Sequence, residues 1–211
     1  MRRLIRCIAG VMVLIGGHAV AGVYEDMLHA VNNDDERTVA QLLQRGVDVN
    51  TVDPTGESLL MLAARRGKPE MVKVILDARP RVNARNAHGE TALMLAAFNG
   101  QTDVVRSLLA QGAEFNHSGW NALIYAAARN RVDIARILIA RGAQVNAQAD
   151  NGTTALMMAA REGHLQMVLL LMEHGADINH KTSAGHSALG LAKDHGRRDV
   201  AQALVRAGAV E

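Results

Sequence analysis

Aromatic side chains are scarce in this chain. Of its 211 residues only 2% are aromatic, which amounts to one tryptophan, two tyrosines and two phenylalanines. A single thick core usually relies on such side chains, because each of them buries a large apolar area. The composition therefore favours thin layers of helices that pack through small residues such as alanine over one thick aromatic core.

Cysteine is almost absent as well, and the single one, Cys7, lies in a segment that we expect to be removed. The first 21 residues begin with three arginines, continue with an apolar run over residues 7–17 and end in an A-x-A triplet. This order is typical of a secretory signal peptide. We therefore predict a signal peptide at residues 1–21, cleaved after Ala21. An uncleaved anchor is the alternative, although the apolar run is shorter than the roughly 20 residues needed to cross a bilayer.

Removal of the signal peptide changes the composition of the chain, and with it the kinds of site and partner that can be excluded. The mature chain, residues 22–211, has no thiol, which excludes a disulfide framework, a thiolate metal site and a cysteine nucleophile. Cleavage also removes three of the 23 Lys and Arg residues and none of the 21 Asp and Glu residues, which leaves 20 against 21, a net charge of −1. The isoelectric point near 9.0 thus comes from the signal peptide. We expect no nucleic-acid partner, no membrane contact after cleavage and a location in the periplasm of a Gram-negative bacterium.

An internal repeat organises the mature chain. Corresponding asparagines follow one another at intervals of 33, 33, 30 and 33 residues, and corresponding glycines at intervals of 33, 30, 33 and 33. One repeat is therefore three residues short, and the deletion lies between Asn116 and Gly119. The aligned positions are Asn50, Asn83, Asn116, Asn146 and Asn179, and Gly56, Gly89, Gly119, Gly152 and Gly185.

The repeated text resembles the ankyrin repeat, in the form common in bacteria where T-A-L-M replaces T-P-L-H. Two examples are GETALMLAAFNGQTDVVRSLLAQGAEFN and GTTALMMAAREGHLQMVLLLMEHGADIN. The resemblance implies an all-α ankyrin-repeat solenoid of about six helix-turn-helix repeats with short hairpin loops, which fills residues 22–211. The expected repeats are residues 23–50, 51–83, 84–116, 117–146, 147–179 and 180–211.

The residue pattern agrees with this fold. In the segment from Ala92 to Phe98, small and aliphatic residues recur on one helical face, and alanine pairs at matching positions of the repeats permit close helix packing. No single repeat buries its own apolar face, so stability comes from stacking between polar end caps. One turn departs from the pattern, with Arg79 and Pro80 in place of Gly-Ala. We expect a reshaped loop there, because arginine enters a left-handed turn less readily than glycine.

The common catalytic motifs are missing from the sequence. It contains no G-x-G-x-x-G, G-x-x-x-x-G-K-[ST], H-E-x-x-H or G-x-S-x-G. The aspartates recur at equivalent repeat positions, which is typical of capping rather than of a unique active site. His180, His186 and His195 have no carboxylate or cysteine at ligand spacing. We therefore expect no enzyme activity, no metal and no cofactor.

The resemblance also implies where a partner binds. Ankyrin partners usually lie on the concave surface formed by the hairpin tips and the exposed face of the inner helices. A central tryptophan beside arginines is typical of a binding hot spot, although Trp120 has a structural alternative, which is to cover Tyr125 in the shortened repeat. The positions that correspond to this surface are Arg65, Arg66, His88, Glu90, Phe98, Asn99, Trp120, Arg129, Thr153, Arg161 and Glu162.

These observations predict a periplasmic monomer that binds a protein partner. The partner's identity stays open, and so does the role of the complex. We weigh an immunity-type inhibitor and an accessory factor of an envelope enzyme, with a structural scaffold or tether in the envelope as the alternative.

Overall fold

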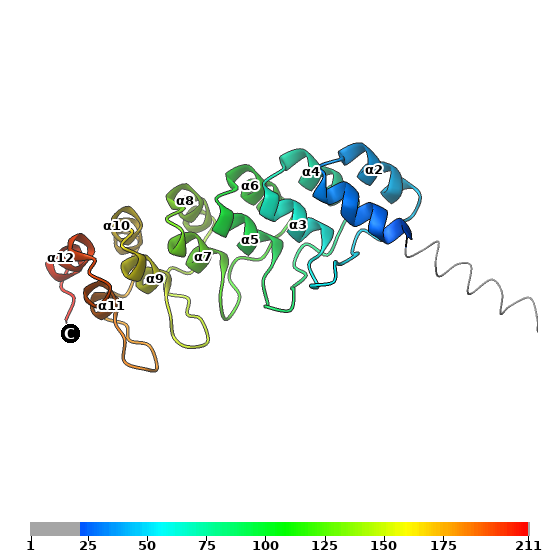
Figure 1. Ribbon diagram of the computed structural model, residues 1–211. Helices are drawn as coiled ribbons and strands as arrows, with labels where there is room; N and C mark the ends of the chain where they lie inside the picture. Colours follow the sequence, from blue (N-terminus) through cyan, green and yellow to red (C-terminus); the bar gives the residue numbers. More distant parts are fainter. Residues whose placement is uncertain (1–21, 211) are drawn as a thin grey trace, which may run out of the picture.

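The computed structural model describes residues 22–210, in which pairs of helices stack into one elongated row (Figure 1). The predicted signal peptide lies outside the described residues. The described part is helical, with three isolated β-bridges in its hairpins and no strand, so the predicted all-α fold is confirmed. None of the helices in residues 22–210 is long and apolar enough to cross a membrane.

The helices form two layers, and the hairpins project from the side of the inner layer (Figure 1). Each inner helix packs on the next inner helix, and each outer helix packs on the next outer one. The first repeat pairs a helix over residues 22–32 with the first outer helix. The inner helices that follow are α3 (Leu59–Arg66), α5 (Ala92–Asn99), α7 (Ala122–Ala128), α9 (Ala155–Glu162) and α11 (Ala188–Asp194). The outer helices are α2 (Glu36–Gln44), α4 (Pro69–Asp77), α6 (Thr102–Ala110), α8 (Val132–Ala140), α10 (Leu165–Glu173) and α12 (Arg198–Arg206).

Alanine pairs let the inner helices approach one another closely. The pairs in α3, α5, α7 and α9 have no exposed surface, as the sequence pattern predicts. Each of the five labelled inner helices also begins at a Ser, Thr or Asn whose side chain accepts a hydrogen bond from the first turn. Such a cap satisfies a backbone N–H that has no partner within the helix. The threonine of the repeated T-A-L-M motif is this cap.

The aligned asparagines connect each repeat to the next one. In all five, the side-chain oxygen accepts a hydrogen bond of 2.8–2.9 Å from a backbone N–H beyond the outer helix of the next repeat. Asn146, for example, accepts from the N–H of Asp177 and donates to the carbonyl of Gly175. The asparagines therefore recur because each one fixes the spacing between two repeats. The bonded N–H groups belong to Arg81, Glu114, Gln144, Asp177 and Val210.

A glycine ends α5 for two reasons. Gly100 has a left-handed backbone with φ of 80°, and a Cβ atom there would lie 2.8 Å from Nε of Arg131. Arg131 enters this space from the next repeat to donate a 3.2 Å hydrogen bond to the carbonyl of Phe98. The residue must therefore tolerate positive φ and leave room for the next repeat.

The turn at Arg79 differs from our expectation. We expected a reshaped loop, but Arg79 takes the left-handed conformation itself, with φ of 55°. The N–H of Arg81 still bonds to Asn50, so the connection between the repeats is kept. Pro80 has no N–H, and the bond that Ala113 makes to Leu108 in the next repeat is therefore lost here.

Candidate functional site

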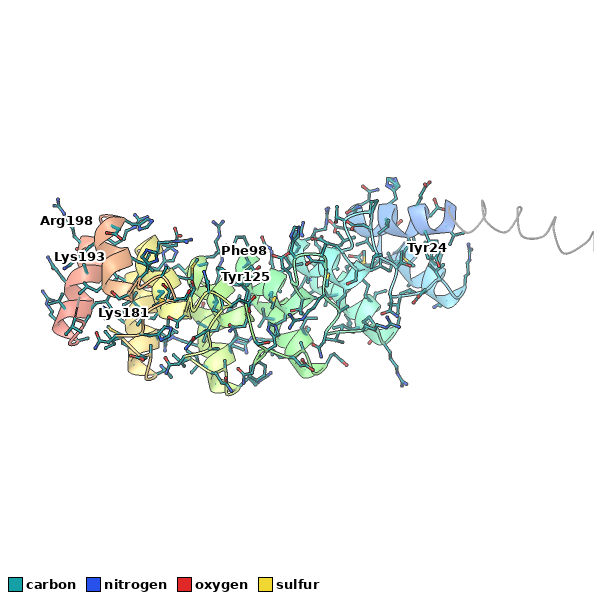
Figure 2. The ribbon with its side chains drawn as sticks, turned by 90° about the horizontal axis from the view of Figure 1, so that it is seen from below. Tyr24, Phe98, Tyr125, Lys181, Lys193 and Arg198 are labelled. Carbon is teal, nitrogen blue, oxygen red and sulfur yellow. The ribbon has the colours of Figure 1, made fainter. Side chains whose placement is uncertain are left out.

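Three aromatic side chains from neighbouring repeats meet near the middle of the row. Tyr125 lies in α7, Phe98 near the end of α5, and Trp120 just before α7. The ring of Tyr125 contacts Phe98 edge to face, with the ring centres 5.8 Å apart, and contacts Trp120 in the same manner at 5.6 Å. Figure 2 shows Phe98 and Tyr125 beside each other between the two ends of the row. Edge-to-face contacts of this kind stabilise a fixed arrangement of the rings.

Tyr125 is hydrogen-bonded to a carboxylate of the preceding repeat. Its hydroxyl donates a 2.9 Å hydrogen bond to Oε1 of Glu90, and Oε2 of Glu90 accepts one of 2.9 Å from Asn86. Burial, reinforced by this hydrogen bond, raises the pKa of Tyr125 well above its usual value. The tyrosine thus stays a neutral donor under all ordinary conditions, and the position of its ring is fixed.

Two arginines flank the aromatic side chains. The guanidinium of Arg129 lies over the ring of Phe98, with Cζ 4.8 Å from the ring centre, a cation–π arrangement. Arg161 binds Glu162 through a 2.8 Å ion pair. Both arginines lie at the C-terminal end of an inner helix, after its buried residues, where the side chains reach solvent. Charged and aromatic groups are therefore exposed side by side on the face formed by the inner helices and hairpins, which we call the inner face.

The inner face contains a hollow of about 510 Å³ at this place. Met158 and Arg161 also border a second hollow of about 490 Å³ nearer the C-terminus. Together the two hollows extend over several repeats, so a partner that binds here would contact more than one of them. The first hollow, which we call the aromatic hollow, is lined by His88, Phe98, Trp120, Tyr125, Ala128, Arg129, Met158, Arg161 and Glu162.

Six of the eleven residues expected to bind a partner line the aromatic hollow. They are His88, Phe98, Trp120, Arg129, Arg161 and Glu162. Trp120 combines features of both hypotheses: it covers part of Tyr125, as the structural alternative expects, yet 39% of its surface remains exposed. An exposed tryptophan in a hollow has the geometry of a binding anchor.

The other five expected residues have different surroundings. Glu90 accepts the hydrogen bond from Tyr125, and Thr153 lines the second hollow. Asn99 donates a hydrogen bond to Leu95 in its own helix. Arg65 is paired with the buried Glu57.

Arg66 is held by the first repeat. It forms a 3.3 Å ion pair with Asp34, and Lys68 forms a second one of 3.0 Å. The hydrogen bond from Lys68, together with that from Arg66, lowers the pKa of Asp34. Sequence spacing did not reveal these pairs, because they depend on how far each repeat is displaced from the next one.

The structure also draws attention to a residue that the sequence analysis passed over. His117 lies in the shortened hairpin, and both nitrogens of its imidazole are buried without a hydrogen-bond partner in the described part of the chain. Burial, and then the charge of Arg85, lower the pKa of His117. In the sequence, His117 was marked only by its position in the hairpin that is three residues shorter than the others. The hairpins of the other repeats carry a repeated backbone hydrogen bond, such as Asn86 N–H to Glu90, that this shorter hairpin lacks.

Three histidines of the C-terminal half lie with a ring nitrogen against a backbone carbonyl. The ring nitrogen of His164 lies 3.2 Å from the carbonyl of Ala128, and that of His174 lies 2.9 Å from Leu170. His180 likewise contacts a backbone carbonyl of the preceding repeat. In residues 22–210 no three His, Cys, Asp or Glu side chains lie close enough to hold a metal ion.

Comparisons with known proteins agree with the observed architecture. A family model described as ankyrin repeats (3 copies) matches residues 27–118, 82–149, 112–182 and 142–210. No curated protein matches the chain. Among solved structures, one chain in the complex of the predatory endopeptidase Bd0816 from Bdellovibrio bacteriovorus with the immunity protein Bd3460 is 31% identical, with a TM-score of 0.77. The similarity covers 86% of the present chain and 97% of that chain.

Proposed function

Since the chain belongs to the ankyrin-repeat family, a family of protein-interaction modules, we propose that it is a periplasmic immunity-type protein that binds and inhibits an envelope endopeptidase. The partner lies on the inner face, with its contact centred on the aromatic hollow. The similarity to a chain from an endopeptidase–immunity protein complex supports this choice over an accessory role.

One observation carries the proposal: Trp120 is exposed in a hollow whose other walls are fixed. Tyr125 is hydrogen-bonded to Glu90, Arg129 lies over the ring of Phe98, and residues of three successive inner helices line the hollow. A surface that is rigid before binding loses little conformational entropy when the partner arrives. Tryptophan and arginine are the residues that most often supply the binding energy of such contacts.

The location is tested separately from the binding. We propose that residues 1–21 direct export to the periplasm, and that the mature chain begins at Gly22. The tagged full-length protein is expressed in its host, the periplasm is released by osmotic shock, and the N-terminus is sequenced. A soluble periplasmic product beginning at Gly22 agrees with the proposal. A product that stays with the membrane and keeps its first residues favours an envelope tether.

The binding is tested with residues 22–211 immobilised and exposed to an envelope extract of the host. The bound protein is identified, purified and assayed for endopeptidase activity with increasing amounts of the repeat protein. We expect an endopeptidase whose activity falls to zero at equimolar repeat protein. The same assay is repeated with Trp120→Ala and with its control Leu169→Ala, which removes an exposed side chain of the outer helix α10. A partner whose activity is unchanged or increased would refute inhibition.

A further inference from the structure

The charges around the aromatic hollow do not balance. Arg129 and Arg161 line it, against a single carboxylate, that of Glu162. Glu162 is already bound by Arg161 through a 2.8 Å ion pair. The other acidic residue nearby, Glu90, is occupied on both oxygens by Tyr125 and Asn86. The hollow therefore has no carboxylate left for Arg129.

Arg129 differs from the other three arginines that were expected to bind a partner, because it has no carboxylate partner among the residues that the structure describes. Within residues 22–210 no carboxylate lies within ion-pair distance of its guanidinium, and its side chain contacts the ring of Phe98 instead. Arg65, Arg66 and Arg161 are each paired with a carboxylate. The N–H groups of a guanidinium lie in one plane, in an arrangement that suits the two oxygens of a carboxylate.

The walls of the hollow would strengthen such a bond. Phe98 lies under the guanidinium, and Trp120, Tyr125 and Met158 line the same hollow. Apolar surroundings lower the local dielectric constant, so a charge pair formed there is stronger than one in open water. The same surfaces offer contact to an apolar side chain beside the carboxylate.

A hollow on the outer layer has a different character. It measures about 710 Å³ and is thus larger than the aromatic hollow. Its lining includes Arg131 and Arg136 but also Asp133 and Glu173, and no aromatic residue. Because its positive and negative residues are equal in number, this hollow has no preference for a partner of either charge. We therefore propose no acidic contact there.

We propose that the aromatic hollow receives an acidic residue of the protein partner, a glutamate or aspartate flanked by an apolar side chain, and that Arg129 binds its carboxylate. This rests on the proposed function and names the chemistry of the partner segment. The carboxylate accepts two parallel hydrogen bonds from the guanidinium, while the flanking side chain packs against Trp120.

The chain offers a direct reporter, because Trp120 is its only tryptophan. We would titrate residues 22–211 with the peptide acetyl-Gly-Glu-Phe-Glu-Gly-amide, and with its glutamine and lysine counterparts, and follow Trp120 fluorescence. We expect a saturable change with the glutamate peptide, about tenfold weaker binding of the glutamine peptide and no binding of the lysine peptide. Equal binding of the three, or no saturable change with the glutamate peptide, would overturn the proposal.

A pair of variants assigns the effect to Arg129. Arg129→Gln removes the charge from the hollow, and Arg106→Gln removes a charge that is also exposed, from the outer helix α6. We expect Arg129→Gln to abolish the difference between the glutamate and glutamine peptides, and Arg106→Gln to preserve it. Both variants are compared with the wild type by circular dichroism, so that loss of fold is recognised.

The captured protein partner separates this inference from the proposed function. If Trp120→Ala weakens binding of the partner and Arg129→Gln does not, the inner face binds the partner but the proposed acidic contact is wrong. If both variants weaken it, and added salt reduces the effect of Arg129→Gln, both proposals stand. If neither variant weakens it, the partner binds elsewhere and both fail.

Discussion

The hydroxyl of Tyr125 donates a hydrogen bond to Glu90, which lies 35 positions earlier in the preceding repeat, at a distance of 2.9 Å. This bond joins the shortened repeat to its neighbour and fixes the ring on which Trp120 and Phe98 rest. The aromatic hollow is therefore a product of contacts between repeats, and its shape depends on the integrity of this interface.

Tyr125→Phe should destabilise the fold by about 1–2 kcal/mol, because the variant leaves Oε1 of Glu90 without its donor in a partly buried place. Urea unfolding followed by circular dichroism measures the change. Tyr24→Phe is the control, since Tyr24 is exposed and its hydroxyl makes no hydrogen bond within residues 22–210. Equal stability of the two variants would show that the Tyr125–Glu90 bond contributes nothing.

Arg79→Gly should stabilise the protein. Arg79 holds a left-handed backbone with φ of 55°, which costs a non-glycine residue roughly 1 kcal/mol. Glycine adopts this conformation without strain, although it also gives the unfolded chain more freedom, so the net gain will be somewhat smaller. Thermal and urea unfolding measure it. The comparison variant Arg141→Gly changes the residue just before a left-handed glycine and should destabilise.

His117 makes stability depend on pH. Its folded-state pKa is lowered, mainly by burial, so below about pH 6.5 the unfolded chain takes up a proton that the folded chain does not. Stability from this residue is thus present above that pH and is lost as the pH falls toward the folded-state pKa. His117→Phe keeps a ring of similar size and removes the titration.

We expect this variant to be at least as stable as the wild type near neutral pH, because the two ring nitrogens have no partners to lose. Its advantage should increase on going from about pH 7.5 to pH 5.5, as measured by urea unfolding at each pH. The control is His186→Phe, which makes the same substitution at an exposed histidine. An advantage of His117→Phe that is independent of pH would contradict this account.

The sequence predicted the features that recur from repeat to repeat. The helices and the buried alanine pairs repeat because every interface between repeats is built in the same way, so an average pattern describes each of them. The aligned asparagines were recognised from spacing alone, and the structure supplies the reason, a hydrogen bond to the next repeat.

Features that occur once were harder to predict. The pairing of Arg66 with Asp34, or of Tyr125 with Glu90, depends on side-chain conformation and on the displacement between two particular repeats. Arg79 shows the same difficulty for the backbone. Its own preference argued against the left-handed turn, but the packing of the helices on either side and the hydrogen bond from the N–H of Arg81 to Asn50 favour it. Tertiary contacts overrode the local preference.

The central claim is that the aromatic hollow binds the protein partner, and Trp120→Ala tests it most directly. The affinity of the captured envelope protein is measured by surface plasmon resonance for the wild type, Trp120→Ala and Leu169→Ala, each with confirmed helicity. We predict that Trp120→Ala weakens binding by about tenfold or more, as expected for a hot-spot tryptophan, and that Leu169→Ala binds like the wild type. A folded Trp120→Ala variant with wild-type affinity would contradict the account and place the partner on another face.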